Sequence, residues 1–127
     1  DLSEILEEKS QNKKPKIIPK RKRKEEPVYE IDLHIHKLVS STRGMSNYDM
    51  LTKQIEVAQN RLEYAIANKI QRMVFIHGVG DGVLRMEIEY LLNRYPEVKY
   101  FDANYQKYGV GATEVFIYKN PKKSYYS

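Results

Sequence analysis

The chain has 127 residues, which is enough for one domain with its own hydrophobic core. It has no cysteine, which excludes disulfides and thiolate metal sites and predicts a reducing, cytoplasmic location. Its 22 Lys and Arg outnumber its 17 Asp and Glu, which invites a nucleic-acid interpretation that depends on where the charge lies. The absence of an apolar run of roughly 18–20 residues argues against a membrane partner.

The positive charge is concentrated at the N-terminus. Residues 1–24 hold 9 Lys and Arg against 4 Asp and Glu, whereas residues 25–127 hold 13 of each. Residues 1–27 contain the run Lys20–Lys24 and too few apolar residues to offset the entropy of folding, so we predict a disordered basic linker. This linker is either a spacer or a non-specific phosphate-binding arm. Because the chain opens at Asp1 in tail-like sequence, we expect it to belong to a longer protein with attached domains.

Residues 28–119 have the patterning of a folded domain, and residues 120–127 are expected to form a C-terminal tail. Apolar and polar residues alternate from Tyr29 to His36, which is the period of a half-buried strand. A polar loop is predicted over Lys37–Asn47. The polar face of the strand holds three side chains that can take part in chemistry: Asp32, His34 and His36.

Two amphipathic helices are predicted next, with a buried strand between them. The segment Ser46–Asp49 resembles a capping box, and apolar residues recur at helical spacing from there to about Lys69. Arg72–His77 is a short apolar run without alternation, as in a strand covered on both faces. A second helix follows the glycine-rich turn at Gly78–Gly82 and ends before Pro96.

Two further strands, Val98–Ala103 and Glu114–Tyr118, complete the order β-α-β-α-β-β. Crossover connections between parallel strands are right-handed, and two that move in the same direction place both helices on one face of the sheet. The sequence therefore predicts an α/β fold, a two-layer βαβαββ sandwich with a mixed four-stranded sheet and two helices on one face. We expect the isolated domain to be monomeric.

All three histidines of the chain, His34, His36 and His77, fall at the carboxyl ends of the first two predicted strands. Their rings converge near Asp32 if these strands are parallel neighbours, and ligands bind at that edge of open α/β sheets. A single histidine on a polar face is usually solvated, but such a cluster beside a glycine-rich turn is as consistent with a functional site as with a solvated surface. A rival hypothesis is a zinc site formed by the three histidines, and Asp32 is a candidate ligand for a divalent metal ion.

Two glycine-rich segments, at residues 78–82 and 109–113, are candidate phosphate-binding loops. Glycine lets backbone N–H groups converge on an anion, and the first loop precedes a helix N-terminus, where the dipole favours negative charge. Each segment is equally compatible with a simple tight turn. The residues predicted to contact a phosphate are Gly78, Gly80, Gly82, Arg85, Gly109, Gly111 and Thr113.

Three blocks together resemble the motifs of the small MutS-related (Smr) domain family. They are Asp-Leu-His at Asp32–His34, His-Gly-x-Gly-x-Gly-x-Leu-Arg at His77–Arg85, and Gly-Val-Gly-Ala-Thr-Glu-Val at Gly109–Val115. The resemblance covers about residues 30–118. It implies a βαβαββ domain that nicks or cleaves DNA or RNA, alone or attached to other modules.

For this chain the resemblance predicts an endonuclease in which His77 is a general acid or base, His34 is a second one and Asp32 orients a histidine. We expect His77→Ala to abolish cleavage without unfolding the domain. The rival functions are a catalytically silent module that binds nucleic-acid structures and a protein-interaction adaptor. The chain departs from the family pattern at Ile35, where glycine is usual, and in the length of the connection at Lys37–Asn47.

Overall fold

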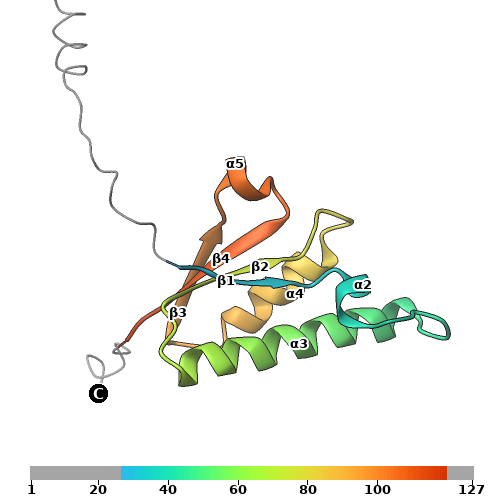
Figure 1. Cartoon of the computed structure of the whole chain (residues 1–127), viewed down its shortest axis with the longest axis horizontal. Helices are drawn as coiled ribbons and strands as arrows, with labels where there is room; N and C mark the ends of the chain where they lie inside the picture. Colours follow the sequence, from blue (N-terminus) through green and yellow to red (C-terminus); the bar gives the residue numbers. More distant parts are fainter. Residues whose placement is uncertain (1–26, 120–127) are drawn as a thin grey trace, which may run out of the picture.

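The computed structural model of the chain describes residues 27–119. Within them, a four-stranded sheet carries two long helices on one face (Figure 1). Apart from Pro27, the predicted N-terminal linker lies outside the described residues, and so does the predicted tail at 120–127. None of the helices formed by residues 27–119 has the length and apolar character needed to cross a membrane.

The sheet is mixed, with the strand order β1-β2-β4-β3. The strands β1 and β2 are parallel neighbours, and β4 runs antiparallel to both β2 and β3. This arrangement confirms the predicted fold class, a βαβαββ sandwich with a mixed sheet. The strands span Tyr29–Asp32 (β1), Arg72–Ile76 (β2), Val98–Asp102 (β3) and Ala112–Ile117 (β4).

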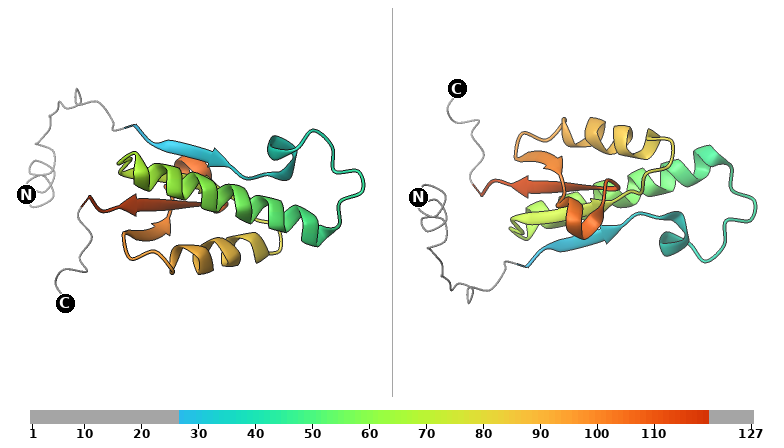
Figure 2. Two further views of the ribbon diagram at one scale, coloured as in Figure 1. Left: turned by 90° about the horizontal axis from the view of Figure 1, so that it is seen from below. Right: turned by 90° about the horizontal axis from the view of Figure 1, so that it is seen from above.

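Two long helices, α3 (Asn47–Ala67) and α4 (Val83–Leu92), pack side by side on one face of the sheet (Figure 2). The predicted capping box starts α3, because the hydroxyl of Ser46 accepts a hydrogen bond from the backbone N–H of Asp49 and the Asp49 carboxylate accepts one from the Ser46 N–H. Two single-turn helices complete the fold: α2 (Ile35–Leu38) and α5 (Tyr105–Tyr108).

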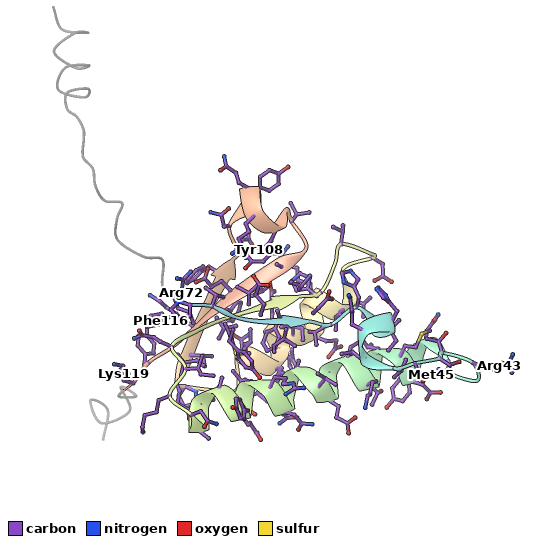
Figure 3. All side chains as sticks on the ribbon, in the orientation of Figure 1. Arg43, Met45, Arg72, Tyr108, Phe116 and Lys119 are labelled. Atoms are coloured by element: carbon purple, nitrogen blue, oxygen red, sulfur yellow. The ribbon has the colours of Figure 1, made fainter. Side chains whose placement is uncertain are left out.

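The main core fills the space between the sheet and the two long helices. A second, smaller cluster of Val74, Ala103 and Ala112 lies on the opposite face of the sheet, where Tyr108 of α5 packs against it (Figure 3). Each of the four strands therefore contributes to a core, and the sheet is a rigid base for its loops. The buried residues of the main core are Ile31, Leu33, Ala58, Leu62, Ala65, Met73, Phe75, Ile88, Leu91, Leu92, Val115 and Ile117.

The first strand is shorter than the alternating pattern predicts. It ends at Asp32, because the Asp32 carboxylate accepts a hydrogen bond from the backbone N–H of His34 and turns the chain out of the sheet. The next residues form α2, so the prediction of a strand through His36 is wrong, and His36 lies exposed on that short helix. The helix α5 was also not predicted, although its first turn has a recognisable signal, the Asn104 side chain that accepts from the Lys107 N–H.

Candidate active site

Asp32 and His34 form a hydrogen-bonded pair where β1 ends. The same carboxylate oxygen, Oδ1 of Asp32, lies 2.7 Å from Nδ1 of His34 and 3.0 Å from its backbone nitrogen. An ionised carboxylate can only accept, so Nδ1 carries the proton and Nε2 of the neutral ring is the unprotonated nitrogen. The His34 side chain is 44% exposed, which leaves the imidazole accessible to a substrate.

Asp32 is held in its ionised form. Partial burial raises the pKa of Asp32, but the two hydrogen bonds from His34, together with electrostatic attraction to His34 and Lys37, outweigh it, so that the pKa lies below its ordinary value. A carboxylate that stays ionised keeps the tautomer of His34 fixed and stabilises the ring when it takes up a proton.

Nε2 of His34 lies directly against the first glycine-rich loop. A Cβ placed on Gly78 would come within 2.8 Å of Nε2 of His34, so no residue with a side chain fits there without displacing the ring. Gly78 also has a φ of 78°, in the left-handed region that favours glycine. This contact joins the Asp32–His34 pair to the Gly78–Gly82 loop.

His77 occupies a different environment. It is only 6% exposed, its Nδ1 lies 2.9 Å from the carbonyl oxygen of Gly78, and its Nε2 lies 2.9 Å from the hydroxyl of Thr113. Since a carbonyl can only accept, Nδ1 donates to Gly78 and the hydroxyl of Thr113 donates to Nε2. Both ring nitrogens are thus engaged within the protein, so His77 is a buried, hydrogen-bonded residue and not an exposed one at the edge of a loop.

The pKa of His77 lies below its ordinary value. Burial is the main cause, because it penalises the charged ring; the hydrogen bond to Gly78 opposes the shift and the charge of Arg85 adds to it. A neutral, buried imidazole that bridges β2 and β4 is suited to holding the two loops in place.

The two glycine-rich loops contact each other. The backbone N–H groups of His77 and Gly78 both donate to the carbonyl oxygen of Gly111, at 2.9 Å each. A Cβ on Gly111 would lie 3.0 Å from Cα of Gly78, so the absence of a side chain permits the close approach of the loops. Gly109 ends α5 with a φ of 68°, and Thr113 is 1% exposed with its hydroxyl directed at His77. Thr113 therefore positions the site and has no surface with which to contact a phosphate.

The first loop leads directly into the N-terminus of α4. Gly80 and Gly82 have positive φ values, and Gly82 caps the helix without a side-chain hydrogen bond. The carboxylate of Asp81 accepts a hydrogen bond from the Val83 N–H at 3.0 Å and thus occupies one of the helix donors.

Arg85 lies one turn into α4, near the same loop. Its guanidinium forms ion pairs with Glu89, at 3.2 Å, and with Asp102 of β3. The hydrogen bond with Glu89 is the main reason that the pKa of Arg85 is raised, so the residue stays cationic. Its charge is balanced by two carboxylates, and a phosphate would have to compete with them.

The hypothesis of a zinc site formed by three histidines finds no geometric support. The rings of His34 and His36 lie 5.8 Å apart, but the two nitrogens of His77 face Gly78 and Thr113. Among residues 27–119, no group of three or more His, Asp or Glu side chains is placed to hold a metal ion.

One positioning residue escaped the sequence analysis. The side-chain amide of Gln54 on α3 donates to the carbonyl oxygen of Leu33 at 2.8 Å, between Asp32 and His34 in the chain. The signal was present, because Gln54 interrupts the apolar stripe of its helix at a position three residues after Leu51.

Comparisons with known protein families and sequences agree on one family. The family model of the Smr domain matches residues 43–118. Endonuclease MutS2 of Streptococcus pneumoniae strain CGSP14 is 28% identical over 99 residues, as is that of serotype 19F strain G54; the aligned part is 75% of this chain and 13% of the relative. The chain thus spans only a small part of the curated relatives that it matches.

A solved structure matches the fold. The crystal structure of the Smr domain of Thermus thermophilus MutS2 superposes with a TM-score of 0.55 and 27% sequence identity. The match covers 71% of this chain and 98% of the solved one, so it includes nearly the whole solved domain.

Proposed function

Because this chain belongs to the Smr domain family, we propose that it binds nucleic acid and cleaves a phosphodiester bond at the edge of the sheet where β1 and β2 end. One observation carries the proposal. The exposed imidazole of His34, oriented by Asp32, presents its unprotonated nitrogen beside the Gly78–Gly82 loop. The relatives named endonuclease MutS2 support a nuclease of this class.

In the proposed hydrolysis, Nε2 of His34 takes a proton from the attacking water molecule as the water oxygen forms a bond to phosphorus. The bond from phosphorus to the leaving oxygen breaks, that oxygen takes up a proton from solvent water, and the imidazolium of His34 later returns its proton to the solvent. Asp32 stabilises the imidazolium that forms on His34. The N–H groups of Gly78 and Gly82 donate to Gly111 and Val79, so the phosphate faces the N–H groups of residues 79–81 and the positive end of α4. His77 holds this loop against Gly111.

The proposal predicts that His34→Ala lowers the cleavage rate by about 100- to 10,000-fold, since this is the usual contribution of a general acid or base. The matched control is His36→Ala, which removes an exposed histidine two residues away and should leave the rate unchanged. The measurement is cleavage of labelled single-stranded, duplex and branched DNA and RNA, with and without a chelator.

Two results would contradict this assignment. One is a His34→Ala variant that keeps the wild-type rate in a preparation free of contaminating nuclease. The other is a cleavage rate that falls in a His77 variant shown by circular dichroism to be folded, but not in His34→Ala. This result would assign the acid–base role to His77.

A second candidate function is a catalytically silent module that binds nucleic acid for an attached domain. The observation that favours it is the pairing of Arg85 with Glu89 and Asp102, because this cation near the loop is already neutralised by carboxylates. Stable binding of the same substrates without cleavage under all conditions would select this alternative.

A further inference from the structure

A groove of about 430 Å³ opens beside the candidate active site. It lies between α2 and the first turns of α3 and α4, which Figure 1 shows at the same end of the molecule as the loop between β2 and α4. Most of its walls are apolar: Ile35 comes from α2, Tyr48 and Met50 come from α3, and Val83 comes from α4. Its volume falls in the range of small-ligand pockets, about 300–1,000 Å³.

The groove is lined by residues that neighbour the proposed catalytic residues in the chain. Ile35 follows His34 in the chain, and Asp81 of the glycine-rich loop forms part of the wall. The side chain of Gln54 also lines the groove while its amide donates to the carbonyl oxygen of Leu33, the residue before His34. A nucleotide whose phosphate lies at His34 therefore has this groove directly beside it.

The chemistry of the walls selects a base rather than a phosphate. The carboxylate of Asp81 repels an anion, whereas a neutral ring can approach it. Tyr48 is 75% exposed and offers an aromatic face for stacking, and the side-chain amides of Asn47 and Gln54 are of the type that recognises base edges.

We propose that this groove takes one unpaired nucleobase of the substrate, next to the phosphate that is cleaved, with Tyr48 stacked on it. The inference rests on the proposed function and adds a substrate class to it, because a base can enter the groove only when it is unpaired or has left the helical stack. The domain thereby prefers single-stranded segments, loops or branch points to continuous duplex.

One wall of the groove comes from a residue at which this chain departs from the family pattern. Ile35 stands where the family pattern usually has glycine, and its side chain supplies a wall on the side of α2. The connection from α2 to α3, which carries Arg43 and Met45 (Figure 3), projects beyond this end of the molecule.

The test uses the full chain and fluorescein-labelled single-stranded DNA and RNA oligonucleotides, with a hairpin duplex of the same sequence for comparison. Tyr48→Ala removes the stacking face, and Met50→Trp fills the groove. The matched control is Tyr90→Ala on α4, which removes an equally exposed tyrosine, 69% exposed, outside the groove. Fluorescence anisotropy gives the affinity, and the two labelled strands show whether DNA or RNA is preferred.

We expect Tyr48→Ala to weaken single-strand binding by roughly 5- to 150-fold, the cost of one lost base–aromatic stack, and Met50→Trp to weaken it as well. The affinity for the duplex should stay unchanged in both variants, and Tyr90→Ala should bind the single strand as tightly as the wild-type chain. An oligonucleotide that lacks the base beside the cleaved phosphate should bind the wild-type chain more weakly by the same factor. Tyr48→Ala should weaken the binding of this abasic oligonucleotide little further.

The outcomes separate the two proposals. If the wild-type chain binds none of the oligonucleotides, the proposed function and the base groove both fail. If it binds or cleaves them, but Tyr48→Ala and Met50→Trp behave like Tyr90→Ala, the base groove alone is refuted. Titration with nucleoside monophosphates provides a second measurement, because an occupied groove should shift the methyl resonance of Met50, and an unshifted resonance at saturation refutes the groove.

Discussion

The buried bridge between His77 and Thr113 gives the sharpest prediction about stability. His77→Ala removes a ring that is 6% exposed and leaves the Thr113 hydroxyl and the Gly78 carbonyl without their partner. An unsatisfied buried polar group costs about 1–3 kcal/mol, and the vacated space adds to this cost. We therefore expect a loss of about 2–4 kcal/mol in the free energy of unfolding, or roughly 10–30 °C in Tm for a domain of this size.

The measurement is urea unfolding followed by far-UV circular dichroism, since the chain has no tryptophan to report by fluorescence. Thr113→Val removes only the hydrogen bond to His77 and should cost about 1–2 kcal/mol. The exposed His36 supplies the control, because His36→Ala should change stability by less than about 0.5 kcal/mol. A His77→Ala variant as stable as His36→Ala would refute the view that His77 supports the fold.

Two further predictions concern His77 and Gly111, where the two glycine-rich loops meet. Because burial lowers the pKa of His77 in the folded chain, protonation of this ring favours the unfolded chain. The free energy of unfolding should therefore be highest above the pKa of the unfolded chain, about 6.5, and should fall as the pH drops through the lower pKa of the folded chain. Urea titrations at several pH values should show a weaker pH dependence for His77→Gln. Gly111→Ala should cost about 1–3 kcal/mol, because its Cβ would lie 3.0 Å from Cα of Gly78; an unchanged urea midpoint would show that the loops separate without penalty.

Most of the fold could be predicted from periodicity and local signals. The capping box at Ser46–Asp49 fixed the start of α3, and the apolar run at Arg72–His77 located β2, because these features depend on neighbouring residues alone. The end of β1 could not be predicted in the same way. Alternation continues to His36, but the Asp32 side chain competes for the backbone and ends the strand four residues earlier.

The different burial of His34 and His77 could not be predicted from the sequence either. Both histidines follow a strand, so their spacing in the sequence predicts that they lie at the same edge of the sheet. It does not predict how deeply each ring is buried. Just after β2, the His77 N–H donates to Gly111, the residue before β4, so the chain stays close to β4 and the ring lies beside Thr113. At His34 the turn made by Asp32 lifts the chain away, and the ring remains exposed above Gly78.

The difference in burial between His34 and His77 affects how well each ring can transfer a proton to a substrate. Transfer of a proton to a substrate requires a nitrogen that is both accessible and able to change its charge, and burial works against both at His77. His34 meets the first condition through its exposure, and the second is met by Asp32, whose ionised carboxylate can balance the positive charge of the ring. A substitution at His34 should therefore change the rate with little effect on stability, and one at His77 should change stability first and the rate only through the loops that it holds.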